Sequence, residues 1–106
     1  MSENIHFSRR PPSHPGELMR EIIEGQADLS VTDAARRMGV SRQALHAVLH
    51  GQSVVSADMA LRFARLTGGS AERFLRLQES LDIWTARQRL GLSLARIQPI
   101  TPKRPH

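Results

Sequence analysis

Serines and glycines divide the middle of this chain into short segments, and this punctuation constrains the fold more than any other feature. A serine or threonine favours the start of a helix because its hydroxyl accepts a free backbone N–H, and glycine favours the end because it tolerates positive φ. The expected caps are Ser30 or Thr32, Ser41, Ser56 and Ser70, and the expected stops are Gly25, Gly39, Gly51, Gly68–Gly69 and Gly91. Order is expected to begin at Pro15. Five helices are predicted, ending near residues 24, 38, 50, 67 and 89, with no strand, so the fold class is all-α.

Apolar residues recur at helical spacing within each predicted segment and define a candidate core. In the first four segments they are Leu18, Met19, Ile22, Ile23, Ala34, Ala35, Met38, Leu45, Val48, Leu49, Met59, Ala60, Phe63 and Ala64. In the last segment Phe74, Leu77, Leu81 and Trp84 form a stripe at i, i+3, i+7 and i+10. The stripe suits either domain core or the seam of a homodimer. Because a small domain cannot cover so long a helix, we assign a dimer interface to this stripe, above all to Leu81 and Trp84.

The length and composition of the chain suit one small domain. The chain has 106 residues, of which 40% are hydrophobic and 24% are charged, and it has no cysteine. The lack of cysteine excludes disulfides, thiolate zinc sites and cysteine nucleophiles. No apolar run is long enough to cross a membrane and residues 1–12 hold no hydrophobic signal region, so a cytoplasmic protein is expected. The predicted organisation is a flexible leader over 1–14, a domain with a C-terminal dimerisation helix over 15–89, and a flexible basic tail over 90–106.

The net charge of +5 is concentrated at the C-terminal end of the chain. Residues 1–82 are balanced, with ten arginines and ten acidic residues. The excess comes from Arg87, Arg89, Arg96, Lys103 and Arg104. Fourteen of the fifteen basic residues are arginine, whose guanidinium group forms forked hydrogen bonds with phosphate or guanine. The charge therefore favours a polyanionic partner, and the tail is expected to add affinity without choosing a sequence.

The segment from Thr32 to Leu45 has the spacing of a helix-turn-helix. This motif needs a small residue where its two helices cross, a residue tolerant of positive φ in the turn, and a branched apolar residue beneath the second helix. Ala35, Gly39 and Leu45 meet these needs at spacings of four and six residues. The second helix would then present its first residues to the major groove of DNA.

The exposed residues of this motif have the chemistry needed to read and hold DNA. Arg42 suits guanine and Gln43 suits adenine, whereas hydroxyls and peripheral side chains suit phosphate. The predicted DNA-binding residues are Thr32, Arg36, Ser41, Arg42, Gln43, His46 and Gln52. The alternative is that Arg42, Gln43 and His46 form an ordinary solvated helix face. The complete motif spacing favours DNA recognition.

Four short stretches resemble the HigA-type antitoxins, a branch of the Xre/Cro-like regulators. They are His14–Leu18, Met38–Arg42, Leu49–Gly51 and Phe74–Gln78. The resemblance covers about residues 14–84, and it departs from the family pattern at Phe74, where family members usually carry tryptophan. It implies a five-helix phage-repressor-like (lambda repressor-like) fold. It also implies a homodimer that binds a palindromic operator over its own promoter and neutralises a RelE-like ribonuclease toxin.

Other function classes are weaker. His46 and His50 have metal-ligand spacing, but no third ligand is evident and Ala47 replaces the glutamate of a metalloprotease motif. The acidic residues form no acid–base pair, and capping explains the serines, so neither an enzyme nor a cofactor nor a small-molecule substrate is predicted.

The acidic first helix is compatible with two interpretations. Glu17, Glu21 and Glu24 could face a basic ribonuclease toxin, but an ordinary solvated face is favoured. The alternative function is a plain Xre/Cro-like transcriptional regulator without a toxin partner. A third hypothesis is a toxin-binding protein whose helix-turn-helix no longer binds DNA.

Overall fold

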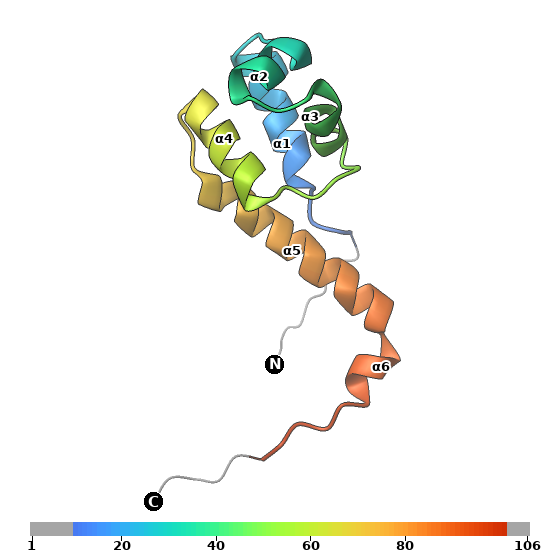
Figure 1. The fold of residues 1–106 in the computed structure, drawn as a ribbon. Coiled ribbons are helices and arrows are strands. Elements are labelled where there is room, and N and C mark those ends of the chain that lie inside the picture. The colour runs from blue at the N-terminus through green and yellow to red at the C-terminus, as the bar shows by residue number, and fades with distance from the viewer. Residues whose placement is uncertain (1–9, 102–106) are drawn as a thin grey trace, which may run out of the picture.

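A computed structural model describes residues 10–101 of the chain, and this part is built from helices without a strand (Figure 1). The elements are α1 (Pro15–Glu21), the π-helix η1 (Ile22–Gln26), α2 (Val31–Met38), α3 (Arg42–Leu49), α4 (Ala57–Thr67), α5 (Ala71–Leu90) and α6 (Leu92–Ala95). The all-α prediction is confirmed, and α2 and α3 form the helix-turn-helix. The described structure adds η1 and α6 to the five predicted helices. Residues 1–9 of the predicted leader and residues 102–106 of the predicted tail lie outside the described residues.

Serine hydroxyls cap four helices as the sequence predicts. Each accepts the backbone N–H three residues on: Ser30 at 3.1 Å, Ser41 at 3.0 Å, Ser56 at 3.1 Å and Ser70 at 3.4 Å. Ser30, rather than Thr32, is therefore the cap of α2. At the start of α5, hydrogen bonds from a backbone N–H and from the Ser70 hydroxyl lower the pKa of the Glu72 carboxyl.

The prediction that the first helix stops at Gly25 is wrong. The helix continues through Gly25 as a π-turn, in which the Ala27 N–H donates to the Ile22 carbonyl at 2.8 Å. The chain reverses three residues later at Asp28, which has φ of 53°. Aspartate tolerates this left-handed conformation, and the wider turn keeps Ile23 fully buried.

The core lies between α1, α2, α3, α4 and the first half of α5. Its largest side chains include Phe63 and Phe74, whose rings meet edge to face at 5.2 Å between centroids. Phe74 is 2% exposed, so its assignment to a dimer interface is corrected: it packs inside the domain. The other residues of that stripe, Leu77, Leu81 and Trp84, are half-buried.

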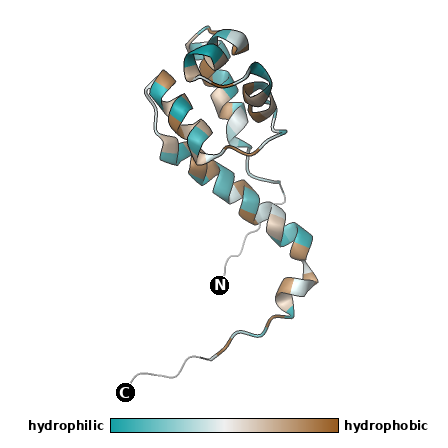
Figure 2. Ribbon diagram, viewed as in Figure 1, coloured by the Kyte–Doolittle hydropathy of each residue, from teal (hydrophilic) through white to brown (hydrophobic). Residues whose placement is uncertain are grey.

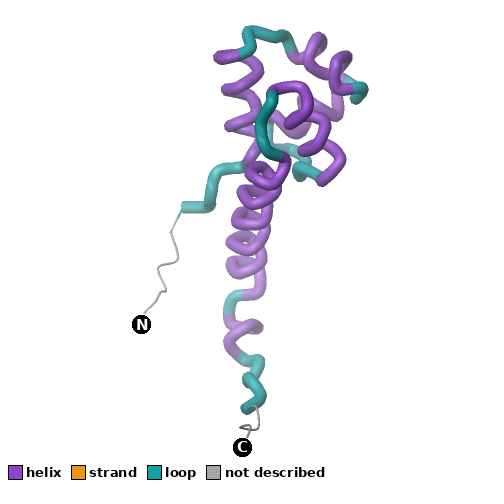
Figure 3. The backbone as a smooth tube through the Cα atoms, turned by 90° about the vertical axis from the view of Figure 1, so that its left-hand side faces the viewer, coloured by secondary structure: helices purple, strands orange, loops and turns teal. Residues whose placement is uncertain are grey.

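The distal half of α5 extends out of the helical bundle and continues into α6 (Figures 1 and 3). Hydrophobic positions recur along this protruding part, as Figure 2 shows. The exposed large apolar residues here are Ile83, Leu90, Leu92, Leu94, Ile97 and Ile100. The turn of helix at α6 was not predicted, because four residues are too few for a periodic signal.

Candidate nucleic-acid interface

The turn between α2 and α3 is built as the sequence spacing predicts. Gly39 ends α2 with φ of 74°, a left-handed conformation that a side chain would disfavour. Ala35 and Leu45 are both buried, with exposures of 1% and 0%. The small residue lets the two helices approach, and the leucine anchors α3 on the core.

A residue that the sequence reasoning missed, Arg62 on α4, holds this turn from outside the motif. Its Nη1 donates to the Met38 carbonyl at 2.7 Å, and its Nε donates to Asp58 at 3.2 Å. The bond to Met38 satisfies a carbonyl at the end of α2, where no intrahelical donor remains. The i,i+4 spacing of Asp58 and Arg62 was visible in the sequence, but the contact with Met38 depends on the packing of α4 against α2.

The first turn of α3 presents the two residues predicted to read bases. Arg42 and Gln43 are exposed, and within residues 10–101 neither side chain has a hydrogen bond or ion pair. The Ser41 hydroxyl is occupied as the cap, accepting from the Ala44 N–H, but it remains exposed. A helix N-terminus with uncommitted polar side chains suits an anionic partner.

His46, one turn further along α3, stacks on His50. The ring centroids are 4.0 Å apart with an interplanar angle of 24°, and His50 Nδ1 bonds to the His46 carbonyl at 3.0 Å. Nearly parallel rings do not aim their nitrogen atoms at a shared point between them. Among the described residues no group of three or more potential ligands could hold a metal.

The predicted phosphate contacts come from α2 and from the segment after α3. Thr32 is exposed in the first turn of α2, and its hydroxyl is not needed for the cap. Arg36 forms an ion pair with Asp33 at 3.4 Å, and both side chains are solvent-exposed. Such a pair contributes little to stability, so a phosphate can replace the carboxylate. Gln52 is exposed in the loop after α3, and no side-chain partner for it lies in the described region.

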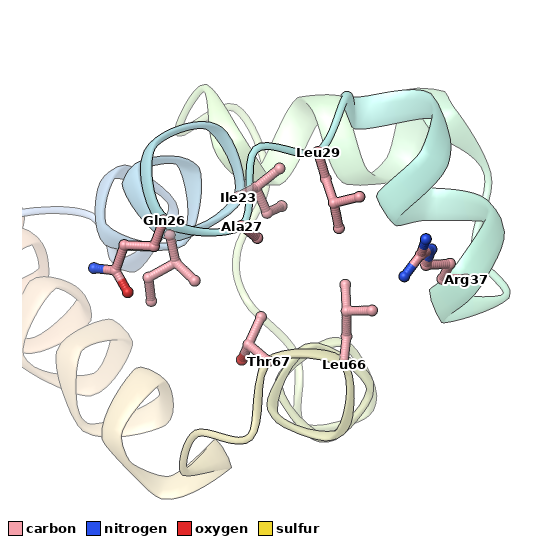
Figure 4. A pocket seen from close by; sticks show the side chains of 8 residues that line it. Ile23, Gln26, Ala27, Leu29, Arg37, Leu66 and Thr67 are labelled. Atoms are coloured by element: carbon pink, nitrogen blue, oxygen red, sulfur yellow. The ribbon is translucent and has the colours of Figure 1, made fainter.

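A separate hollow of about 440 Å³ lies between η1, α2 and α4 (Figure 4). It is lined by Ile22, Ile23, Gln26, Ala27, Leu29, Arg37, Leu66 and Thr67. The side chains of Leu29, Arg37 and Leu66 point into it. None of the predicted DNA-binding residues lines this hollow, so it is distinct from the candidate interface.

No helix within residues 10–101 is long and apolar enough to span a bilayer.

Comparison with known proteins places this chain in a helix-turn-helix family. Residues 16–77 match a family model described as a helix-turn-helix domain. Virulence-associated protein I of Dichelobacter nodosus is 35% identical over 78 residues, which are 74% of this chain and 72% of the relative.

Two solved structures of antitoxins with DNA have the same fold. The antitoxin GraA in complex with its operator is 32% identical, with a TM-score of 0.80 over 93% of this chain and 100% of that chain. The Pseudomonas aeruginosa antitoxin HigA with the higBA promoter is also 32% identical, with a TM-score of 0.78 over 85% of this chain and 99% of that chain.

Proposed function

The chain belongs to the HigA-type branch of helix-turn-helix antitoxins, and on that premise we propose that it represses its own operon and neutralises a partner toxin. In this proposal a homodimer binds a palindromic operator, and the toxin is a RelE-like ribonuclease. The protein acts by binding in the cytoplasm and catalyses no reaction. The observation that carries the DNA-binding part is the exposed, uncommitted pair Arg42 and Gln43 at the start of α3.

In the DNA complex, base reading and phosphate binding fall to different residues. Arg42 donates a forked pair of hydrogen bonds to guanine O6 and N7, and Gln43 pairs with adenine N6 and N7. Thr32, Ser41 and the peripheral Arg36 and Gln52 contact phosphates, while His46 lies one turn deeper along the groove. That two similar antitoxins have been solved with promoter or operator DNA supports DNA binding by this chain.

The homodimer is proposed to form through the distal half of α5. Leu81 and Trp84 are half-buried there, as is Leu77 one turn earlier on the same face of the helix. An apolar side chain of this size on a protruding helix gains free energy when a second copy covers it. Two copies would also place two α3 helices on the two halves of a palindrome.

In this proposal the candidate toxin contact is the acidic face of α1 and η1, for which an ordinary solvated face is the competing interpretation. Glu17, Glu21 and Glu24 are exposed, and the single basic side chain in the same stretch, Arg20, pairs with Glu24 at 3.6 Å. A ribonuclease that binds RNA is expected to carry a complementary basic surface. The alternative, a plain regulator without a toxin, is compatible with the same DNA-binding surface.

Two experiments test the proposal. A gel-shift titration with the DNA upstream of the gene should give a saturable complex that a scrambled duplex does not reproduce at the same salt concentration. Co-expression with the product of the adjacent gene should yield a stable complex and relieve its toxicity. DNA binding without such a complex would favour the plain regulator, and a toxin complex without operator binding would favour a dedicated toxin-binding protein.

A further inference from the structure

Two side chains from distant parts of the chain hold the segment that follows α3. His14, before α1, bonds through its Nε2 to the Ser53 carbonyl at 2.9 Å. Gln78, in the middle of α5, accepts through its Oε1 from the Val55 N–H at 2.8 Å. These partners are separated by 39 and 23 residues in the sequence, and both bonds end within three residues of the same loop.

Gln78 is built into the domain as a fixed hydrogen-bonding group. It is 6% exposed, and among the described residues no other polar or charged side chain is as deeply buried. Its Nε2 donates to the Asp82 carboxylate at 2.8 Å, which orients the amide so that Oε1 faces the Val55 N–H. A buried glutamine with both ends of its amide paired specifies one arrangement of its surroundings, since leaving either end unpaired is unfavourable.

His14 serves α1 and the loop at once. Its Nδ1 accepts from the Gly16 N–H at 2.8 Å and thereby caps α1. The ring proton must then lie on Nε2, which donates to the Ser53 carbonyl. At Gly16, α1 also touches α3 closely, because a Cβ atom at this position would overlap the Val48 carbonyl oxygen.

The loop held by these bonds is part of the proposed DNA surface and has no helical structure of its own. It contains Gln52, a predicted phosphate contact, and Val54, whose side chain is 64% exposed. The N–H groups of Gln52 and Ser53 donate to the Ala47 carbonyl at the end of α3, at 2.8 Å and 3.2 Å. Between the Ala47 carbonyl and the cap of α4 at Ser56, the hydrogen bonds from His14 and Gln78 hold the loop.

We propose that His14 and Gln78 are positioning residues for DNA recognition. They touch no DNA in this proposal. They hold the loop after α3 in one position relative to α3, so DNA binding does not have to bear the free-energy cost of ordering the loop. This inference rests on the operator binding proposed above. Because Gln78 lies on α5, the same bond connects the proposed dimerisation helix to the DNA-binding surface.

The decisive variant is Gln78→Met, which keeps the length of the side chain and removes both hydrogen bonds. We expect operator affinity to fall about tenfold while affinity for a scrambled duplex changes less than about twofold, because ordering the loop would now cost free energy in the specific complex. Hydrogen exchange at the Val55 amide should accelerate by about tenfold or more. The operator is a duplex that the wild-type protein selects from a random library. The matched control is Gln88→Met, the same substitution at an exposed glutamine of the same helix.

Two further variants separate positioning from general damage to the fold. The double variant Gln78→Glu, Asp82→Asn exchanges the amide and the acid. It preserves both hydrogen bonds and the net charge, so it should restore operator affinity to within about threefold of wild type. His14→Asn retains a capping side chain but is too short to reach Ser53, and it should weaken operator binding while α1 stays capped.

The outcomes are distinguishable. If the wild type selects no duplex, the proposed function fails. If it does, and Gln78→Met accelerates exchange at Val55 but leaves discrimination between operator and scrambled DNA unchanged, the positioning role is overturned. Equal losses on both duplexes, or no rescue by the exchanged pair, would also overturn it, because they indicate a general loss of folding.

Discussion

At the scale of single residues, the polar side chains around the helix-turn-helix differ in whether the chain already uses them. Arg62 is committed to the Met38 carbonyl, and the Ser41 hydroxyl is committed to the Ala44 N–H. Arg42 and Gln43 have no such partner within residues 10–101. A side chain that is hydrogen-bonded within the protein stabilises the motif. A side chain at a helix N-terminus without such a bond can bind a ligand without breaking an internal hydrogen bond.

Substitution of the two uncommitted residues should weaken recognition without unfolding the domain. Arg42→Ala and Gln43→Ala are each expected to lose about 1–3 kcal/mol per half-site on the operator, with non-specific binding nearly unchanged. Titrations on operator and scrambled duplexes at one salt concentration measure this. Equal losses on both duplexes would mean that these residues contact phosphate or no DNA at all.

At the scale of the elements, α2 and α3 have eight residues each and are too short to be stable alone. Their stability comes from serine caps at their starts, from packing on the core and from the Arg62 bond across the turn. Two glycines near helix ends differ in backbone conformation and in the space around them. Gly39 adopts positive φ, and Gly25 lies inside the helical run with open space around it.

Alanine substitution at these two glycines should have opposite effects on stability. Gly25→Ala is expected to raise the free energy of unfolding by about 0.5–1 kcal/mol, because alanine loses less backbone entropy in a helix. Gly39→Ala should lower it by about 1–2 kcal/mol, because its Cβ would be in a left-handed conformation and 3.0 Å from Arg62 Nη1. Urea denaturation followed by circular dichroism checks both signs. Destabilisation by Gly25→Ala would contradict the continuous helical run through η1.

At the scale of the whole molecule, the chain is a helical bundle with a protruding arm, and its principal extents are 58, 33 and 23 Å. The bundle covers the first half of α5 and leaves most of the distal half and α6 exposed. Exposed apolar residues and arginines are interspersed along this arm, so it offers both a surface for a second copy and charge for a polyanion.

A charge on the apolar part of the arm should separate the proposed dimer. Leu81→Glu is expected to raise the dimer dissociation constant by about tenfold or more, because a buried unpaired carboxylate is costly. Sedimentation equilibrium over a micromolar range measures it, with Ile83→Glu as a control of the same added charge on the opposite face of the same helix. Equal dissociation of both variants would implicate overall charge, and an unaffected dimer would place the interface elsewhere.

Removal of residues 97–106 should affect the strength of DNA binding but leave its selectivity intact. The deletion takes away Lys103 and Arg104. The slope of log affinity against log salt should therefore become shallower by at most about two phosphate contacts, near 0.9 each. Titrations at several salt concentrations test this. Loss of discrimination between operator and scrambled DNA would show that the tail takes part in sequence recognition.

The features that depend on near neighbours along the chain could be predicted from the residues alone. Ser41 as a cap, Gly39 as a left-handed stop, and Ala35 and Leu45 as buried contacts of the motif all follow from spacing and local backbone chemistry. The assignment of Arg42 to the exposed first turn of α3 follows in the same way. Each of these features depends on residues that lie close together in the sequence.

The features that depend on residues far apart in the sequence became visible only in the packed structure. The helix runs through Gly25 because packing keeps Ile23 buried across the π-turn, and Phe74 belongs to the core because it meets Phe63. Arg62, His14 and Gln78 bond to Met38, Ser53 and Val55, which lie at least 23 residues away in the sequence. A periodic pattern in the sequence cannot predict such contacts. A hydrogen bond between distant segments exists only after the helices have packed, because that packing brings donor and acceptor together.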